Sequence, residues 1–296
     1  MTYYHYTPLK AFRSILQKNP TKDKEICFWA TRIDCFEDKA EYIHGIDKLR
    51  PVLETFESEA ELQEDRRISQ FFSPEDVSRA LGLPIPYVIS ISERKDNEYM
   101  WENYADKSQG VVMELEFPNP RGIYEAALFS IESCLYDCKI SSSELEELVK
   151  EKYMEMAIIM FGGNKEFASM LLRENPEAFV GFIAMYLLAF VAPRFKKDKF
   201  IKEEETRIII SSPKKEYNSL LDNVQCPAVL ENIVTEVKKF VDCKKQRPDN
   251  GNFFREIFMP ISVLKRVYVK GDKQKHEVDE ILRTRGYSHI PVKVMA

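Results

Sequence analysis

Several residue types that carry common chemistries are scarce in this chain of 296 residues. It has 10 glycines, 4 histidines and 2 tryptophans, and its six cysteines form no C-x-x-C pair. So few glycines argue against a disordered or low-complexity chain, and the cysteine spacing offers no zinc-like ligand set. The motifs of P-loop NTPases, Rossmann dehydrogenases, zinc proteases and common serine hydrolases are also missing, which argues against those classes.

Long hydrophobic runs are missing as well. The longest run, 179–192, is shorter than the roughly 20 residues that cross a bilayer, so it predicts a buried helix. The opening M-T-Y-Y-H-Y-T-P predicts a strand rather than a signal peptide. The scattered cysteines are typical of reduced thiols in a cytoplasmic protein. We therefore expect a cytoplasmic protein that does not interact with membranes.

The overall composition is that of a folded, mildly acidic protein. Hydrophobic residues make up 44% of the chain and aromatic residues 12%, and the formal net charge is −5. A chain of this length can bury a full core. The charge is unlike that of a basic nucleic-acid-binding domain, although a local patch leaves nucleic acid open as a partner.

The order of hydrophobic patterns predicts an α+β fold in a single domain, 1–296. We expect a mixed or antiparallel central sheet with flanking helices and a helical insertion at about 141–195. Strands are predicted at 3–6, 26–31, 88–91, 111–117, 127–136, 206–211, 253–258, 264–269 and 289–295. Helices are predicted at 8–17, 48–70, 74–81, 144–160, 165–173, 177–192, 228–243 and 273–285. The helix at 48–70 is expected to be solvated, and Ser142 or Ser143 to cap the helix at 144–160.

The stretch Tyr87–Phe117 concentrates aromatic and polar residues at the ends of predicted strands, where sites are often built. Trp101 and Tyr104 follow one strand at helical spacing, and Gly110 precedes the next strand. Trp101, Tyr104 and the distant Trp29 could stack on a base or a nicotinamide ring. Packing in the core is the simpler interpretation of the same residues.

The second concentration of polar residues is the run Glu203–Arg207, where a charged loop becomes an apolar strand. Alternation places Glu204 and Thr206 on one face of the strand, and Glu205 and Arg207 on the other. One interpretation is a solvated run with a Glu–Arg pair. The other is a strand-end glutamate that faces a cleft and serves as a general base or stabilises an oxocarbenium-like centre.

The remaining candidates are single residues. His5 lies between tyrosines in the first strand, where a histidine is more often structural than catalytic. His44, His276 and His289 have no supporting partners in the sequence. Asp38 and Glu41 form a small acidic pair without a third ligand, so we expect no metal.

Several blocks together resemble the DUF2971 family of uncharacterised prokaryotic proteins. They are Y-H-Y-T with A-F-R-S-I-L, F-E-D-K-A-E at 36–41, the stretch 89–117, and F-K-K-D-K-F-I-K-E-E-E-T-R-I-I at 195–209. The most specific of them is M-W-x-x-Y-A with the glycine and strand that follow. The block at 36–41 lacks the N-D-P-like turn that usually precedes its glutamate, which puts a role of that loop's backbone in doubt. The resemblance implies no particular reaction.

A more local similarity, carried by Y-H-Y-T and the helix that follows, is to ADP-ribosyltransferase-like domains. It implies an enzyme of toxin or phage-defence type that uses NAD as a substrate, with its acceptor open. His5 and Glu205 would be the catalytic residues, with Glu204 as a substitute for Glu205. The residues that would bind the cofactor are Thr7, Trp29, Trp101, Tyr104 and Arg207.

The alternative is a non-catalytic domain that binds a small ligand or a partner through the aromatic block. Geometry separates the two hypotheses. Convergence of His5, Tyr104 and Glu205 on one point favours catalysis, whereas placement of His5 and Glu205 on separate faces favours binding. A hydrolase with Glu41 and Glu93 as paired carboxylates is a third option.

Overall fold

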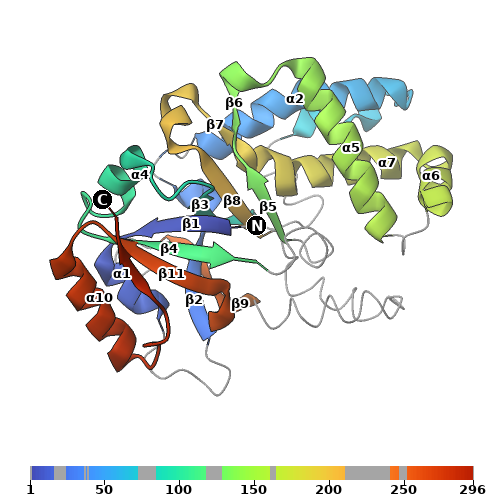
Figure 1. The fold of residues 1–296 in the computed structure, drawn as a ribbon. Helices are drawn as coiled ribbons and strands as arrows, with labels where there is room; N and C mark the ends of the chain where they lie inside the picture. The colour runs from blue at the N-terminus through green and yellow to red at the C-terminus, as the bar shows by residue number, and fades with distance from the viewer. Residues whose placement is uncertain are drawn as a thin grey trace.

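A computed structural model of the chain describes residues 2–16, 25–36, 38, 40–72, 85–117, 129–160, 165–210, 241–246 and 252–295. Figure 1 shows a large sheet with a group of helices beyond one end and two further helices beside the other. The predicted α+β class, with a mixed and mainly antiparallel sheet and flanking helices, is confirmed.

Ten of the described strands form the central sheet, and only the pairing of β11 with β12 is parallel. The main path through the sheet runs β12-β11-β4-β1-β3-β2-β10-β9, and β8 and β5 extend it from β3. The strands of this sheet are β1 (Thr2–Thr7), β2 (Glu25–Arg32), β3 (Tyr87–Ser92), β4 (Val111–Glu116), β5 (Phe129–Ser133), β8 (Glu205–Ile210), β9 (Val241–Gln246), β10 (Phe253–Pro260), β11 (Leu264–Val269) and β12 (Val292–Val294). A separate parallel pair consists of β6 (Leu135–Tyr136) and β7 (Phe195–Lys196).

The sheet forks at β3. One edge of β3 pairs with β8 along its whole length. The other edge is divided, because β2 pairs with the beginning of β3 and β1 meets it only at Ser92. Strand β3 lies inside the sheet and has apolar residues on both faces, with Ile89 and Ile91 on one side and Val88 on the other.

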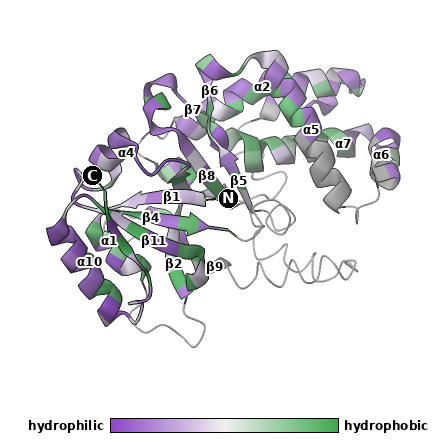
Figure 2. Cartoon of the chain, viewed as in Figure 1, coloured by the Kyte–Doolittle hydropathy of each residue, from purple (hydrophilic) through white to green (hydrophobic). Residues whose placement is uncertain are grey.

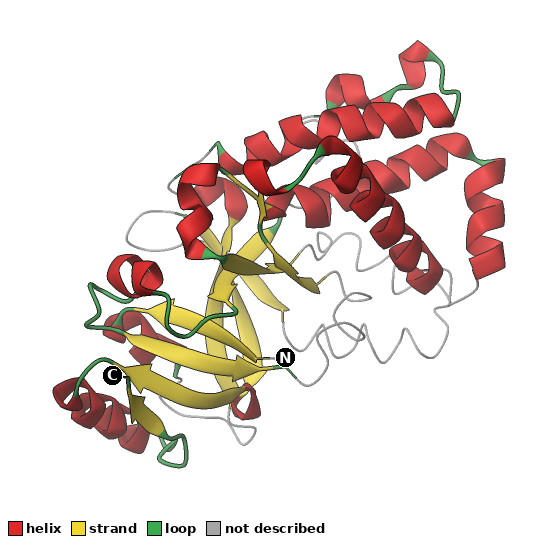
Figure 3. Cartoon of the chain, turned by 45° about the horizontal axis from the view of Figure 1, so that its top comes forward, coloured by secondary structure: helices red, strands yellow, loops and turns green. Residues whose placement is uncertain are grey.

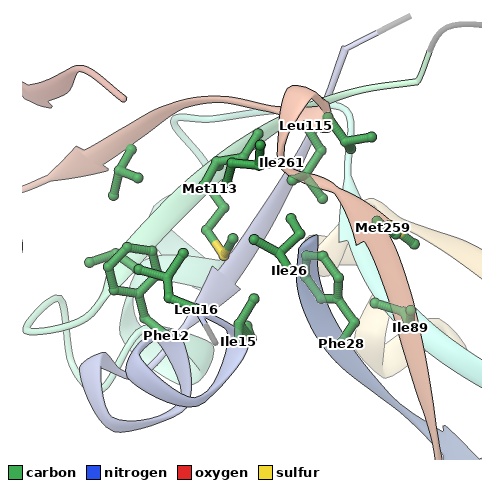
Figure 4. Packing of buried hydrophobic residues seen from close by; sticks show 14 of the residues in the cluster. Phe12, Ile15, Leu16, Ile26, Phe28, Ile89, Met113, Leu115, Met259 and Ile261 are labelled. Carbon is green, nitrogen blue, oxygen red and sulfur yellow. The ribbon is translucent and has the colours of Figure 1, made fainter. Parts of the chain in front are cut away.

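The face that carries Ile89 and Ile91 is covered by α1 (Leu9–Ile15) and α10 (Asp272–Thr284). Figure 4 shows side chains of α1 and of four different strands meeting in this core, with Phe12 and Leu16 close to Met113. Helix α10 is mainly hydrophilic in Figure 2. The residues that it buries against the sheet are Val278, Ile281 and Leu282.

The opposite face of β3 and β8 is covered by helices that lie together in Figure 3. They are α2 (Glu41–Glu59), α5 (Ser142–Met160) and α7 (Pro176–Tyr186), and α6 (Lys165–Glu174) packs against α5 and α7. The prediction of a solvated helix at 48–70 is wrong. Helix α2 ends at Glu59 and buries Leu49, Leu53 and Phe56, whose spacing of three and four residues makes one apolar stripe.

Short helical turns complete the connections. The 3₁₀-helices span Ile33–Cys35, Glu64–Arg66, Ile68–Phe71, Asp137–Lys139, Ala192–Arg194, Asp198–Glu203 and Ile261–Val263. The cap of α5 is Ser141 rather than Ser142 or Ser143. Its hydroxyl accepts from the Glu144 amide at 3.3 Å, and the Glu144 carboxylate accepts from the Ser141 amide at 2.8 Å, which forms a capping box.

Helix α4 (Glu98–Tyr104) is followed by a left-handed turn. Asp106, Lys107 and Ser108 have φ values of 50°, 51° and 63°, a conformation that costs roughly 1–2 kcal/mol per residue outside glycine. A Cβ atom on Gly110 would lie 2.3 Å from the carbonyl oxygen of Thr7, so only glycine lets the turn pass this close to β1.

Most of the other predicted elements agree with the described ones to within a few residues. The exception is the end of the helix expected at 228–243, because residues 241–246 form strand β9. The helix expected at 74–81 and the first part, 228–240, of the helix expected at 228–243 lie outside the described residues. Among the described helices, none has the length and hydrophobicity needed to cross a membrane.

Candidate functional site

A cluster of five charged side chains is buried beside the first half of β8. Arg207 is completely buried, and each of the others is no more than 5% exposed. They come from α2, β7, the 3₁₀-helix that follows β7, and β8: Glu41, Lys196, Glu203, Glu205 and Arg207. Buried charges are rare unless they are paired, and perturbed ionisable groups gather at functional sites, so this ion cluster is the strongest candidate site among the described residues.

Arg207 is the centre of the cluster. Its Nε atom donates to Glu205 Oε1 at 3.0 Å and its Nη2 atom to Glu41 Oε1 at 2.5 Å. Its Nη1 atom donates to the carbonyl oxygen of Pro193. The guanidinium is thus held by two carboxylates and a backbone carbonyl, which is the fixed fork geometry that arginine provides and lysine does not.

Lys196 lies between two carboxylates and donates to both Glu203 Oε2 and Glu205 Oε2. The residue between the two glutamates, Glu204, ends the 3₁₀-helix in the left-handed conformation with φ 45°. The side chain of Glu204 points outward and pairs with Arg94 at 3.1 Å. The run of three glutamates thus has two buried carboxylates and, at a strained residue between them, one exposed carboxylate.

A second unusual backbone feature leads into the cluster. The buried helix α7 passes into a π-helical segment, Leu187–Val191, and then into the 3₁₀-turn Ala192–Arg194. This turn provides the Pro193 carbonyl that accepts from Arg207, and β7 with Lys196 follows it. π-Helical segments occur often at functional sites, so two rare backbone states border the same cluster.

Tyr104 connects the cluster to the surface. Its hydroxyl donates to Glu203 Oε1 at 2.8 Å, while 40% of the residue is exposed to solvent. Asn97 joins α4 to the 3₁₀-helix Asp198–Glu203. Its Oδ1 caps α4 by accepting from the Met100 amide, and its Nδ2 donates to the carbonyl oxygens of Lys202 and Glu203 at 2.8 and 3.2 Å.

Glu205 and Lys196, which form an ion pair with each other, keep their charges. Burial alone would raise the pKa of Glu205, but Arg207 and Lys196 outweigh it and lower this pKa to about 2. Burial alone would lower the pKa of Lys196, but the carboxylates of Glu205 and Glu203 raise it well above its usual value. Glu205 is therefore a carboxylate and Lys196 an ammonium ion throughout the neutral pH range.

Glu203 responds differently in the same cluster. Burial raises its pKa, and the neighbouring carboxylate of Glu205 adds to this effect, against the lowering effect of Lys196 and of the Tyr104 hydrogen bond. Arg207 pairs with Glu205 and Glu41 and does not reach Glu203. The pKa of Glu203 is thus raised, whereas that of Glu205 in the same cluster is lowered.

The neutral neighbours of the cluster are structural. The Tyr136 hydroxyl accepts from the Glu205 amide at 3.2 Å. Burial raises the pKa of the Cys134 thiol to about 12, so it is not a thiolate nucleophile at neutral pH. Within the described ranges, no group of three or more His, Cys, Asp or Glu side chains is arranged to hold a metal ion.

His5 lies on the other face of the sheet. Its ring packs edge-on against Phe28 in the core under α1, with centroids 5.3 Å apart, and its Nδ1–H donates to the Ser90 carbonyl at 2.9 Å. Glu205 and Arg207 alternate with Ile208 and point to the face of β3 that carries Val88. The structure therefore does not bring His5 and Glu205 together.

The hydrogen bond of His5 has a structural explanation. At the fork, neither β1 nor β2 pairs with β3 at Ser90. The imidazole supplies the donor that a paired strand would have supplied to the Ser90 carbonyl. Burial lowers the pKa of His5, which keeps the ring neutral in this role.

The other predicted binding residues have separate surroundings. Thr7 is buried at the end of β1, where it pairs with Val111. Trp101 is completely buried against Tyr6, and its Nε1–H donates to the Lys95 carbonyl at 3.1 Å. Trp29 is 42% exposed and stacks on Phe254 in another part of the sheet. Of the seven predicted site residues, Glu205 and Arg207 thus belong to the ion cluster and Tyr104 contacts it through Glu203.

Glu41 and Glu93, the two carboxylates of the hydrolase hypothesis, have separate partners. Glu41 is buried and bound to Arg207. Glu93 is exposed and accepts from the Ser133 hydroxyl at 3.4 Å.

Sequence reasoning missed Lys196 and Glu203 as members of the site. Both lie in the block at 195–209, and Glu41 lies in the block at 36–41, so the motifs that suggested a family also contained the whole ion cluster. The signal was available but incomplete, because nothing in a linear pattern says that a lysine nine residues before a glutamate will bind it. Asn97, which positions Tyr104 against Glu203, belongs to the third block.

The fold and this cluster define an α+β protein with a buried ionic centre that reaches the surface at one tyrosine. The model of the DUF2971 family, described as a protein of unknown function, matches residues 100–208. This match confirms the resemblance to that family, and it contains Tyr104, Lys196, Glu203, Glu205 and Arg207. No curated protein matches the chain. No solved structure matches it either.

Proposed function

We propose that the protein is a ligand-binding domain whose site lies where Tyr104 covers Glu203. The observation that carries the proposal is the hydrogen bond from a substantially exposed tyrosine to a carboxylate that is 1% exposed. A ligand that replaces the Tyr104 hydroxyl reaches a buried, strongly polar centre without opening the apolar core. An aromatic wall with a few fixed polar groups is typical of small-molecule sites.

The position of His5 supports binding over the catalytic arrangement. His5 and Glu205 point to opposite faces of the sheet, so one substrate cannot contact both without a rearrangement of the fold. In addition, both oxygens of Glu205 are engaged by Lys196 and Arg207. A carboxylate neutralised in this way is a poor partner for a developing positive charge.

A ligand screen with matched variants tests this function. We expect a compound library to yield ligands that stabilise the wild-type protein against heat, and Tyr104→Ala to lose that stabilisation. Tyr99→Ala is the control, because it removes a tyrosine from the same helix α4 without touching Glu203. The proposal fails if the ligands stabilise Tyr104→Ala as much as the wild type.

An NAD-using, ADP-ribosyltransferase-like enzyme is the second candidate. The observation in its favour is that Glu205 opens strand β8 as an ionised carboxylate, the state that transfer from NAD requires. Incubating the protein with labelled NAD and with protein and nucleic-acid acceptors tests it, with Glu205→Gln as the inactive variant. If no label is transferred and NAD does not bind, this candidate is eliminated while the binding function stands.

A further inference from the structure

We propose that the ligand of this site carries a cationic group, an ammonium or a guanidinium, that binds Glu203 beneath the ring of Tyr104. This inference rests on the proposed binding function and adds the chemical class of the ligand. It follows from the charges of the ion cluster, from the chemistry of Tyr104 and from the geometry around Glu203.

The ion cluster has one carboxylate more than it has cations. Glu41, Glu203 and Glu205 face only Lys196 and Arg207 within the cluster. Arg207 serves Glu41 and Glu205, and Lys196 is shared between Glu205 and Glu203, so Glu41 and Glu203 each share a single cation with Glu205. Of these two carboxylates, Glu203 is the one that a partly exposed side chain, Tyr104, contacts. A buried carboxylate in this situation is stabilised either by a proton or by a further cation.

Both carboxylate oxygens of Glu203 have partners, and one of these partners, Tyr104, is itself partly exposed at the surface. Lys196 occupies its Oε2 atom from inside, and its Oε1 atom accepts from the hydroxyl of Tyr104. An ammonium or guanidinium group that displaces this hydroxyl forms an ion pair with the carboxylate, in which donor and acceptor are both charged, whereas the tyrosine hydroxyl is an uncharged donor. The carboxylate then bridges two cations, and the charges of the cluster balance.

Tyr104 adds a second attraction for a cation. Its ring is held at the surface by α4, and the backbone of α4 is tied to that of Glu203 through Asn97. A cation over an aromatic ring is attracted by the negative face of the ring. A carboxylate next to an exposed aromatic ring therefore selects against anions and favours cations over neutral groups of the same shape.

A proton and the cationic ligand compete for the same oxygen atom. The groups that face Glu203 are Lys196 from β7, Glu205 from β8 and Tyr104 from α4, and of these Lys196 and Glu205 keep their charges at neutral pH. Binding of the cation requires ionised Glu203. Affinity is therefore expected to rise with pH up to the pKa of Glu203 and to level off above it.

The experiment uses small probes that differ in charge and share one shape. Butylguanidinium, butylammonium, neutral butylurea and pentanoate are titrated into the full-length protein labelled with ¹³C in its tyrosine rings. The Tyr104 signal is identified by its loss in Tyr104→Phe. N-Acetylarginine-N-methylamide serves as a separate probe, because it tests whether an arginine side chain in a peptide can supply the cation. We expect the cations to shift the Tyr104 signal, and butylurea and pentanoate to bind at least tenfold more weakly.

Matched variants locate the binding charge. Glu203→Gln keeps the size of the side chain and removes its charge, whereas Glu204→Gln makes the same change at the exposed neighbouring residue. We expect Glu203→Gln to weaken cation binding at least tenfold and to abolish its pH dependence, and Glu204→Gln to leave both unchanged. Tyr104→Phe keeps the ring and frees Oε1, so it is expected to bind butylguanidinium more tightly, measured by calorimetry.

The outcomes separate this inference from the proposed function. If butylurea or pentanoate shifts the Tyr104 signal as strongly as the cations do, the inference of a cationic ligand is wrong, and the proposed binding function at Tyr104 is still supported. Unchanged cation affinity in Glu203→Gln has the same meaning. If no probe shifts the Tyr104 signal and the library screen also yields no ligand that depends on Tyr104, both proposals are wrong.

Discussion

The two halves of strand β8 are equally buried but chemically opposite. Glu205, Thr206 and Arg207 form the first half, and three consecutive isoleucines form the second. The isoleucines alternate between the two hydrophobic clusters of the sheet, Ile208 and Ile210 in one and Ile209 in the other. The charged half binds groups from four other elements, whereas the apolar half requires only close packing.

This difference shows what burial demands of each kind of residue. Apolar side chains are stabilised by any well-packed apolar neighbour, because the hydrophobic effect is not directional. A buried charge needs specific partners at fixed positions, and losing one leaves an uncompensated ion. A chain that maintains a π-helical segment and a left-handed Glu204 next to such a cluster maintains it against a cost in stability, which points to a use beyond folding.

Removing a charge from the first half of β8 should have the largest effect on the stability of the protein. Arg207→Met removes the partner of both Glu41 and Glu205, and we expect a loss of about 5 kcal/mol in the free energy of unfolding. Chemical denaturation at neutral pH measures it. Lys197→Met is the control, because its ion pair with Asp38 is more exposed and should contribute less than about 1 kcal/mol. Equal losses in the two variants would mean that burial adds nothing to the pairing.

Opening a cavity in the apolar half should have a slightly smaller effect. Ile208→Ala removes buried methyl and methylene groups from the core shown in Figure 4, and we expect a loss of about 3–4 kcal/mol. The pH dependence of stability should keep its wild-type shape, since no ionisable partner is lost. A changed pH profile, measured by thermal unfolding in a buffer series, would show that the two halves are not independent.

Acidification should distinguish the two inward-pointing glutamates. The folded-state pKa of Glu205, about 2, lies below its ordinary value of 4.5, so its stabilising contribution is complete above the ordinary value and is lost as pH falls toward 2. This contribution is roughly 3 kcal/mol. The raised pKa of Glu203 acts in the opposite sense, because its ionisation in the folded state becomes unfavourable as pH rises from its ordinary pKa through the raised one.

The expected profile is therefore a maximum of stability in the weakly acidic range. Glu205→Gln should flatten the fall on the acid side, and Glu203→Gln should flatten the fall that accompanies rising pH. Unfolding free energies measured between pH 3 and 8 for both variants check this assignment. Identical profiles for the two variants would contradict it.

Relaxing the strained turn should have the smallest effect. Glu204→Gly relieves a left-handed conformation and removes a solvent-exposed pair with Arg94, so we expect a gain of about 1 kcal/mol in stability. Glu204→Ala is the control, because it removes the same ion pair and keeps the strain. A loss of stability in Glu204→Gly relative to Glu204→Ala would mean that the turn is not strained.

Much of the fold was predictable from local pattern. Period-two alternation located β4 and β11, and the run of isoleucines located β8, because a strand must present one side chain in two to each face. Helix α2 was misjudged as solvated, since its apolar stripe is diluted by charges that point away from the core. Strand β9 was not foreseen, since its pairing partner β10 lies further along the chain and no local signal announces it.

The candidate site was predictable only in part. Tyr104 was identified as an aromatic residue that could stack on a ring, Glu205 by its position where a strand begins, and Arg207 as a binding residue implied by the similarity to ADP-ribosyltransferase-like domains. These three residues meet at the ion cluster. His5 stood in an equally suggestive position, yet the alternation of β1 turns it to the other face, where it fills a gap at the fork of the sheet. Because successive residues of a strand point to opposite faces of the sheet, a shift of one residue decides whether a side chain joins the ion cluster or the opposite core. The sequence does not reveal this choice without the register of the strands.

The sequence by itself determined the α+β class, the apolar faces of the main strands and the resemblance to the DUF2971 family, whose model matches residues 100–208. These depend on local periodicity and on residue identity, which can be read along the chain. Only the tertiary structure decided that Glu41, Lys196 and Arg207 share one buried ion cluster and that Tyr104 is its connection to the surface. Charge pairing depends on distances of a few ångströms between residues up to 166 positions apart, and such distances exist only once the chain has folded.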